Sequence, residues 1–510
     1  MSKTSIDSFY LPNIAVQSLP SRDFGKLSPM LTRLTETATP FIALDCFDQS
    51  LRRSGYLLLE TDTAFKLLGA SGALASQPSN GSSRFAAEFS DGPIKQVLAA
   101  LSPLRRLLPL GSGFVHQADL AFVDDQQKTH CRAFFIFLIT QAGDCATLVA
   151  LQGLKGYDES LDQLRNHLKD MGGIALSSSA LYDRLFPGLA TYDPKPEILI
   201  TNDETAFVAA TRIVSTLLPI ARVNVDGIIA DHDTEFLHDY RIQLRKVRSV
   251  LSLFKGVYDD AQTADLKSRF STLMAPTGPL RDLDVYLLER QKFYALLPSR
   301  LHGGLDTLFN MLAERRKAEQ ARLSDHLSSK TYDQEIASLQ RLFTKANSLK
   351  PGANAQLPAH DYACHLIWRR YRKVCKIAMA IGPETEDARI HELRIHCKKL
   401  RYLMEFFSPI FPKSAFKTLL NRLKGLQDNL GLFNDYSVQQ HNLHAFLLEL
   451  PADADGDQLQ VAQSIGALIA ILHGRQLKER AQVVKNFAQF NSPETQQTFS
   501  VLFQARKDEA

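Results

Sequence analysis

The feature that most constrains the fold of this chain is an internal repeat. The stretch HDYRIQLRKVRSVLSLF begins at His238, and the related stretch HELRIHCKKLRYLMEFF begins at His391, with six identities between them. The separation is 391 − 238 = 153 residues, and TGPLRDLDV (277–285) and LGLFNDYSV (430–438) keep it. A register held over such a length without an insertion indicates two copies of one structural unit.

Length and composition describe a multidomain protein of ordinary polarity. A chain of 510 residues is too long for one hydrophobic core and suggests two to four domains. Hydrophobic residues make up 45% and charged residues 22%, as in soluble proteins. The net charge is only +4, so a strongly basic surface must be local and balanced by acidic residues elsewhere.

Targeting, membrane and cysteine patterns give no signal. The first residues lack the apolar run of a signal peptide, and no uninterrupted apolar stretch reaches the length of a membrane span. The six cysteines show no C-x-x-C spacing, so neither a disulfide framework nor a zinc site is indicated. We therefore expect a location in the cytoplasm and no contact with a membrane.

The style of the sequence changes near residue 190. Before it, short β-rich runs alternate with turns, and residues 114–141 predict a hairpin that turns at 124–127. Amphipathic helices are predicted over 92–108 and 158–170, which makes this part α+β. Three prolines in 186–198 predict a linker, after which the helical period continues almost to the C-terminus.

Each copy of the repeated helix carries cations along one side. On a helical wheel Arg241, Arg245 and Arg248 fall within about 80° of His238, and the opposite side is apolar. These four residues form the first cationic stripe. The second cationic stripe consists of His391, Arg394, Lys398 and Arg401. Each stripe is about 15 Å long at the rise of an α-helix.

A run of charges is usually a solvated face, but three details favour an anion-binding face here. Like charges spaced three or four residues apart cost roughly 0.2–0.5 kcal/mol per pair, and no acid interrupts either stripe. The same face recurs after 153 residues. Apolar residues such as Ile242 and Ile395 flank the stripes, which predicts a groove rather than an open surface.

The segments that follow each stripe contribute further polar residues. Arg281 and the supporting carboxylates Asp282 and Asp284 are predicted to lie in a loop, and Asn434 with Asp435 in its second copy. A catalytic carboxylate pair is an alternative, but a helix cap or a partner for a nearby arginine is favoured. Weaker candidates either extend the groove or face water: Lys246, Lys399, Arg369, Arg372, Arg316 and Arg475.

The paired histidines do not predict a metal site. His238 and His391 lack the His or carboxylate partner four residues away that a metal-binding helix shows, and His396 points elsewhere on the wheel. A hydrogen bond from the imidazole to an anion or to a carboxylate is favoured. We expect no metal, no cofactor and no catalytic residue.

Residues 235–248, the R-D-L-D-V segment (281–285) and H-E-L-R-x-x-x-K-K-L-R (391–401) resemble the CHAD family. The resemblance covers roughly residues 200–490. It implies an all-helical domain of two four-helix repeats with pseudo-two-fold symmetry, which binds inorganic polyphosphate in a basic central groove without known catalysis. Asn434 stands where the first copy has Arg281, so the two halves are expected to contribute unequally.

The first part of the chain resembles a degenerate CYTH (triphosphate tunnel) domain, through residues 45–68 and LKGY (154–157). The E-x-E-x-K signature of that family is missing, and the strand expected to carry basic residues reads Leu57-Leu58-Leu59-Glu60. Triphosphate hydrolysis needs carboxylates for metal ions and cations for phosphates.

The predicted domains are 1–185 (CYTH-like, antiparallel β), 186–198 (linker), 199–490 (CHAD, with repeats about 199–347 and 360–490) and 491–510 (helix and tail).

Three functions remain open from the sequence. The leading hypothesis is a polyphosphate-binding protein without turnover, located in the cytoplasm or on polyphosphate granules. A metal-dependent triphosphatase or cyclase activity of the CYTH-like domain is the first alternative. Nucleic-acid binding is disfavoured, because the motif helices carry few exposed aromatic residues and the net charge is low. The sequence leaves the oligomeric state undetermined.

Overall fold

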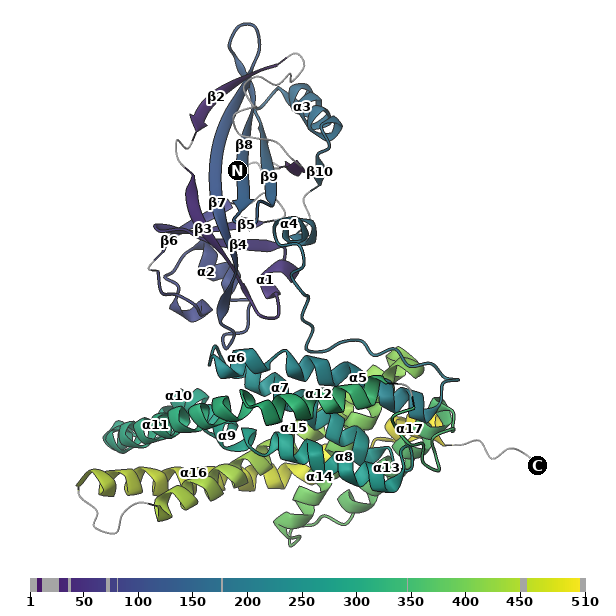
Figure 1. Cartoon of the computed structure of the whole chain (residues 1–510). Coiled ribbons are helices and arrows are strands. Elements are labelled where there is room, and N and C mark those ends of the chain that lie inside the picture. Colours follow the sequence, from purple (N-terminus) through teal and green to yellow (C-terminus); the bar gives the residue numbers. More distant parts are fainter. Residues whose placement is uncertain are drawn as a thin grey trace. The chain divides into compact units, whose positions relative to one another are not determined.

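The chain forms two compact units, Met1–Pro194 and Lys195–Ala510, in a computed structural model (Figure 1). The structure describes residues 7–11, 27–34, 38–69, 74–79, 81–175, 178–345, 347–449 and 456–504. The first unit is built on an antiparallel β-sheet and the second consists of helices. This order of an antiparallel β region and an all-helical region confirms the predicted fold class.

The described strands of the first unit join into one antiparallel sheet. Their order is β10-β1-β9-β8-β7-β3-β4-β5-β6, and β2 pairs with β7. The strands are β1 Asp7–Leu11, β2 Ser28–Leu34, β3 Thr39–Cys46, β4 Tyr56–Glu60, β5 Ala64–Gly69, β6 Leu74–Pro78, β7 Leu107–Val123, β8 Thr129–Thr140, β9 Cys145–Gly153 and β10 Ile174–Ala175.

The hairpin predicted over 114–141 is confirmed by the pairing of β7 with β8. Its turn is stabilised by Asp124, whose Oδ1 accepts hydrogen bonds from the backbone N–H groups of Gln126 and Lys128, both at 2.9 Å. Gln127 adopts a positive φ of 59° in this turn. The polar residues at this point therefore supply the local bonds that reverse the chain.

Two helices cover parts of the sheet. Helix α3 (Asp158–Asp170) confirms the helix predicted over 158–170, and its Leu164 and Leu168 pack against a core that includes Phe135. Helix α4 (Ser178–Leu185) buries Tyr182 against a second core on β3, β4, β8 and β9. Side chains of β8 pack alternately into the two cores, because neighbouring residues of a strand point to opposite faces of the sheet.

The helix predicted over 92–108 is much shorter than expected. Helix α2 spans Pro93–Leu98, and residues from Leu107 onward belong to β7. Pro103 lies between them and disfavours helical geometry in the residue before it. The apolar residues of 92–108 therefore belong to two elements, a short helix and the beginning of a strand, and not to one long helix.

The helices of the second unit repeat with the same offset as the sequence. The helices of the first half are α5 Ala206–Arg222, α6 Val225–Ile229, α7 Thr234–Leu253, α8 Asp260–Met274, α9 Thr277–Leu288, α10 Arg290–Leu296, α11 His302–Leu327 and α12 Lys330–Thr344. Those of the second half are α13 Ala359–Ala378, α14 Asp387–Phe407, α15 Lys413–Leu448, α16 Gly456–Phe490 and α17 Pro493–Phe503. Adding 153 to the first residues of α5, α7 and α8 gives the first residues of α13, α14 and α15.

The two halves differ where the first contains a proline. Helices α8 and α9 are separated at Pro276, whereas the equivalent position 429 is an asparagine inside the continuous helix α15. Proline lacks the backbone N–H needed inside a helix. The predicted loop around Arg281 and Asn434 is therefore wrong, because Arg281 lies in α9 and Asn434 within α15.

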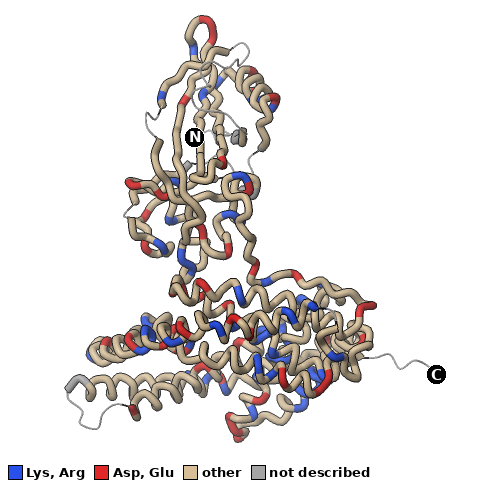
Figure 2. Tube along the Cα trace, viewed as in Figure 1, with Lys and Arg blue, Asp and Glu red and all other residues tan. Residues whose placement is uncertain are grey.

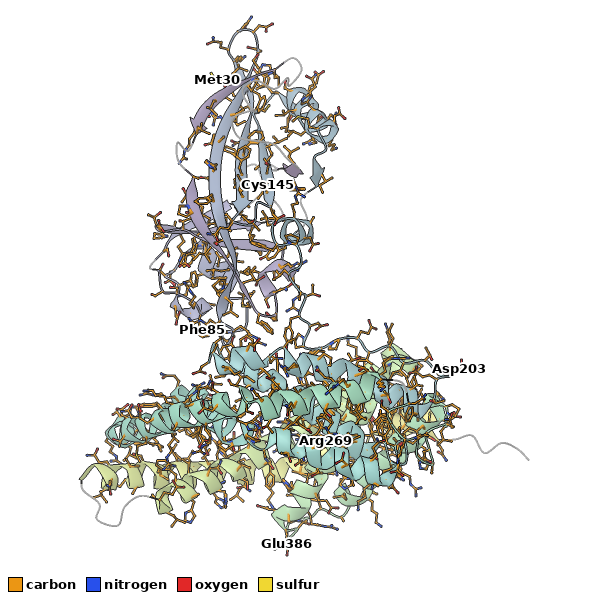
Figure 3. The ribbon with its side chains drawn as sticks, in the orientation of Figure 1. Met30, Phe85, Cys145, Asp203, Arg269 and Glu386 are labelled. Atoms are coloured by element: carbon orange, nitrogen blue, oxygen red, sulfur yellow. The ribbon has the colours of Figure 1, made fainter. Side chains whose placement is uncertain are left out.

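Buried apolar faces hold the helical unit together. Helix α5 buries Ile213, Val214 and Leu217, and its contacts join it to α7 and α12. By length and composition alone, Ala206–Ile229 is apolar enough to cross a membrane. Arg269 of α8, which is labelled in Figure 3, makes two hydrogen bonds, at 2.7 and 3.1 Å, to the carboxylate of Glu335 in α12. Lys and Arg residues are spread over this unit together with Asp and Glu (Figure 2).

Candidate anion-binding site

The first cationic stripe lies on α7. The helix begins at Thr234, and the side chain of Asp233 accepts hydrogen bonds from the first backbone N–H groups, at 2.9 and 3.3 Å. The apolar side of α7 is buried as its period predicts. His238 and Arg241 are half-buried, while Arg245 and Arg248 are exposed.

The second cationic stripe lies on α14, with its apolar side also buried. Arg394 and Lys398 are half-buried, while His391 and Arg401 are exposed. Equivalent residues of the stripes differ in exposure: Arg245 is exposed, but Lys398 at the same repeat position is half-buried. The two stripes thus share a pattern without being identical.

The two helices that carry the stripes contact each other, and charges on one affect groups on the other. Burial, followed by the positive charges of Arg394 and Arg245, lowers the pKa of Lys398 from 10.5 to about 8. Burial and the charge of Arg245 also lower the pKa of Arg394, against the opposite effect of Asp435. Because Arg245 belongs to α7 and the other two cations to α14, the structure brings these three residues together.

The inner end of each stripe is defined as its part towards the N-terminus of the helix, and the outer end as its part towards the C-terminus. At the inner end an arginine lies near an aspartate. Arg394 Nη2 lies 3.8 Å from Asp435 Oδ1. At the equivalent place in the first repeat, burial and the charge of Arg245 lower the pKa of Arg241. The negative charge of Asp282 opposes this effect. Arg241 also donates a hydrogen bond to Thr277 Oγ1. Each aspartate therefore offsets part of the charge of its arginine.

Three guanidinium nitrogens at this end are buried without a hydrogen-bond partner among the described residues. They are Arg241 Nε, Arg281 Nη1 and Arg394 Nε. An unsatisfied buried donor costs about 1–3 kcal/mol, and more when it is charged. Two of these nitrogens hold equivalent positions in the repeats, so the shortage of acceptors is a shared property of both halves.

The outer ends of the two stripes have different contacts. Arg248 Nη1 lies 3.5 Å from Met274 Sδ. The equivalent Arg401 lies 3.4 Å from Gln427 Oε1 and forms a 2.6 Å ion pair with Glu405. Burial is the main cause that lowers the pKa of Lys246. The charge of Glu405 opposes this effect, and the charges of Lys195 and Arg401 add to it. Arg401 is thus also electrostatically coupled to α7.

The paired histidines have different surroundings. His391 Nδ1 lies 2.9 Å from Asn434 Oδ1. The residue that replaces this asparagine in the first copy is Arg281, which can only donate hydrogen bonds. A bond between His238 and Arg281 would therefore need the histidine nitrogen as the acceptor, the reverse of the His391–Asn434 bond. Among the parts of the chain that the structure describes, no cluster of three or more His, Cys, Asp or Glu could hold a metal ion.

The weaker candidates divide into engaged and exposed side chains. Arg316 is held at 2.8 Å by the buried Asp284 and makes two hydrogen bonds, at 2.6 and 2.7 Å, to Asp231. Its ion pairs with Asp231 and Asp284 therefore occupy both edges of its guanidinium group. Lys399 is half-buried, and burial is the main cause that lowers its pKa. Arg369, Arg372 and Arg475 are exposed.

Sequence patterns missed one polar neighbour of the first stripe and one contact of the basic run 369–373. Thr277 accepts the hydrogen bond from Arg241, although it lay inside the TGPLRDLDV segment. Arg370 donates a 2.8 Å hydrogen bond to His396 Nδ1. Burial, followed by the charge of Arg370, lowers the pKa of this histidine from 6.5 to about 4. Arg370 lies in this basic run, which the sequence offers as a possible extension of the groove, but nothing in the sequence connected it with His396.

A comparison with protein-family models finds a match in the helical part of the chain. Residues 212–444 match the family model of the CHAD domain. This part of the chain is therefore similar to CHAD domains. The structure is similar to the crystal structure of the CHAD domain from the plant Ricinus communis, with 23% identity and a TM-score of 0.49 over 60% of this chain and 98% of that one.

A second similar structure is PptA from Streptomyces chartreusis, with 16% identity and a TM-score of 0.42 over 56% of this chain and 99% of that one. No curated protein matches the chain.

Proposed function

We propose that the CHAD domain binds inorganic polyphosphate, or a similar phosphate-rich polyanion, at the two cationic stripes. The observation that carries this proposal is the set of buried, unpaired nitrogens on Arg241, Arg281 and Arg394. These groups require acceptors. Phosphate oxygens are strong acceptors, and arginine binds them with paired, charge-assisted hydrogen bonds.

Repulsion among the cations of the two stripes supports the same ligand. Burial is the main cause that lowers the pKa of Lys398 to about 8, and the positive charges of Arg394 and Arg245 lower it further. A chain of phosphates would neutralise this repulsion along the length of both helices. A ligand that binds only the folded protein also stabilises it.

The residues of the two stripes, Arg281 and Arg316 have expected roles in this proposal. Arg241, Arg281 and Arg394 bind phosphate at the inner end, and Arg245 with Lys398 binds it in the middle. Arg248 and Arg401 bind it at the outer end. His238 and His391 supply hydrogen bonds. Arg316 acts indirectly by holding Asp284, and no residue carries out turnover.

Charge reversal across both stripes tests the proposal. The variant Arg245→Glu with Lys398→Glu should lose polyphosphate binding by more than a hundredfold in isothermal titration. The control is Lys478→Glu with Lys485→Glu, which changes the net charge equally at exposed positions of α16. Equal losses in both variants would show that only net charge matters, and the proposed site would be wrong.

The alternative of a triphosphatase or cyclase rests on the resemblance of the first unit to CYTH domains. Glu60, in the strand expected to carry basic residues, forms a 3.1 Å ion pair with Arg84 and is buried. An engaged carboxylate is a poor metal ligand, so we favour binding without turnover. Incubating the protein with Mg²⁺ or Mn²⁺ and either tripolyphosphate or ATP distinguishes the two, since only an enzyme releases phosphate or pyrophosphate.

Nucleic acid is the competing polyanion. We propose that it binds more weakly, because the stripes present guanidinium and ammonium groups without aromatic side chains for base stacking. Competition between RNA and labelled polyphosphate tests this. A location in the cytoplasm, on polyphosphate granules when these are present, is part of the same proposal.

A further inference from the structure

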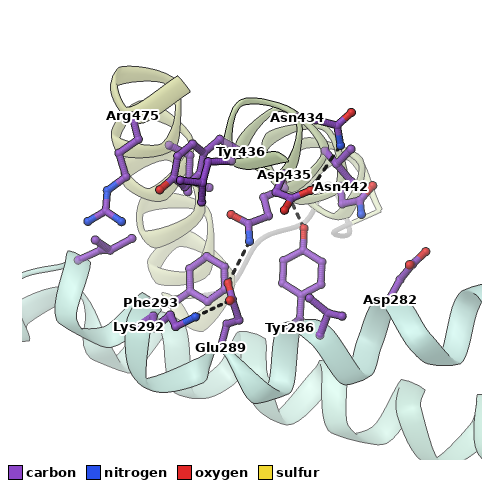
Figure 4. Close-up of a pocket in the computed structure, with 16 residues that line it drawn as sticks. Asp282, Tyr286, Glu289, Lys292, Phe293, Asn434, Asp435, Tyr436, Asn442 and Arg475 are labelled. Atoms are coloured by element: carbon purple, nitrogen blue, oxygen red, sulfur yellow. Dashed lines mark hydrogen bonds and ion pairs between the residues drawn. The ribbon is translucent and has the colours of Figure 1, made fainter. Parts of the chain in front are cut away.

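Two cavities lie beside the inner ends of the stripes, and the function proposed above gives them no role. The first has a volume of about 300 Å³ and lies between α9, α10, α15 and α16 (Figure 4). The second, of about 410 Å³, lies between α9, α11 and α15. Asp282, Tyr286 and Asn442 line both. Such volumes lie at the lower end of the range of small-molecule sites, roughly 300–1,000 Å³.

The first cavity lies where the two repeats meet. The phenol of Tyr286 donates a 3.2 Å hydrogen bond to the backbone oxygen of Gln439, and these residues are 153 positions apart. Asp282 with Asp435, and Val285 with Val438, are further equivalent pairs that line this cavity. Each repeat therefore presents an aspartate to the same space (Figure 4).

The cavities adjoin the cations of the proposed phosphate site. Asp435, which lines the first cavity, lies 3.8 Å from Arg394. Gly278 lines the second cavity, and a Cβ atom there would lie 4.0 Å from Arg241 Nη1. A ligand that fills either cavity would thus have an arginine from a stripe at its edge.

The walls of the cavities do not suit an inorganic chain of phosphates. Tyr286 stacks against Phe293, with ring centroids 5.9 Å apart and planes 15° apart, and Leu432 and Val438 add apolar surface. The carboxylates of Asp282, Glu289 and Asp435 outnumber the cations of Lys292 and Arg475 around the first cavity and would repel phosphate. The same groups suit an aromatic ring and hydroxyl or amino groups that donate hydrogen bonds.

We propose that these cavities receive the nucleoside of a nucleoside polyphosphate whose phosphates lie on Arg241 and Arg394. The base would lie against Tyr286 and its apolar neighbours, and Asp282 or Asp435 would accept hydrogen bonds from the sugar hydroxyls. The inference rests on the proposed function, because the phosphates use the inner end of the same stripes.

Titration of the full chain with ATP and with tripolyphosphate, both without divalent cations, tests the inference. Tripolyphosphate carries more negative charge, so the stripes alone would favour it. We expect ATP to bind about tenfold more tightly, which corresponds to 1.4 kcal/mol. Equal or weaker binding of ATP would overturn the inference and leave polyphosphate binding intact. If long-chain polyphosphate fails to bind, the proposed function fails as well.

A variant that fills the first cavity locates the nucleoside. Val438→Trp places a large side chain at a position that is 48% exposed, and Leu432→Trp at 44% exposure is a second choice if the first misfolds. Either should remove the advantage of ATP and leave tripolyphosphate binding unchanged. The control Val484→Trp, at an exposed position of α16, should change neither. An ATP advantage that survives both cavity variants would contradict this location.

Discussion

The rings of Phe254 and Phe407 stack on each other, with centroids 4.9 Å apart and planes 10° apart. These residues occupy equivalent positions of the two repeats, since 407 − 254 = 153. Phe254 directly follows α7 and Phe407 ends α14, and both are buried. The pseudo-two-fold relation thus passes between the two helices that carry the stripes, and this aromatic pair joins their C-terminal ends.

Removing one ring of this pair should weaken both the fold and the site. We expect Phe407→Ala to lower the free energy of unfolding by about 3–5 kcal/mol, as for other buried phenylalanines. Polyphosphate affinity should fall too, because the ends of α7 and α14 would no longer be held together. Urea denaturation followed by circular dichroism, together with titration of polyphosphate, measures the two effects.

Phe343→Ala is the matched control for this variant. Phe343 is buried against Tyr258 and Phe270, away from the contact between the stripes. It should destabilise the protein by a similar amount and leave the affinity unchanged while the protein is folded. Similar losses of affinity in both variants would show that the aromatic pair has no special part in the site.

Polyphosphate binding should weaken as the pH rises above neutrality. The pKa of Lys398 is about 8 in the empty protein, and a bound anion would raise it. Between these two values binding takes up a proton, so the affinity falls with pH, by up to tenfold per unit. Titrations between pH 7.5 and 9.5 measure this fall. Lys398→Arg should remove most of it, and an identical pH profile in that variant would rule out this lysine.

Arg245→Glu should raise the melting temperature of the ligand-free protein. Arg245 lowers the pKa of both Arg394 and Lys398, so its charge repels them in the native state. A glutamate would attract the same two groups. The control Lys478→Glu should leave the melting temperature nearly unchanged, because this lysine is exposed on α16. A lower melting temperature for Arg245→Glu, measured by calorimetry without ligand, would contradict the repulsion.

The repeat offset allowed much of the helical unit to be predicted from sequence. A periodic apolar face and a constant separation of 153 residues are local properties, and α7 and α14 begin at equivalent residues as a result. The difference between the halves at Pro276 could also have been predicted, since a proline ends a helix where Asn429 does not.

Long-range contacts could not be predicted from the same patterns. Arg316 resembled other exposed cations in the sequence, yet Asp231 and Asp284, 85 and 32 residues away, bind its guanidinium group. The stacking of Phe254 on Phe407 and the proximity of Arg245 to Lys398 likewise depend on how α7 packs against α14. Helical periodicity defines a face of one helix but not the partner of that face.

The salt dependence of polyphosphate binding tests the central claim most directly, because each neutralised phosphate releases counterions. With five or six phosphates bound, the plot of log K against log salt concentration should have a slope of about −4, by analogy with single-stranded nucleic acids. Arg245→Ala, from the first stripe, and Lys398→Ala, from the second, should each reduce its magnitude by about 0.7. A flat response in the native protein, or a slope that only one of these variants changes, would contradict a single site built from both stripes.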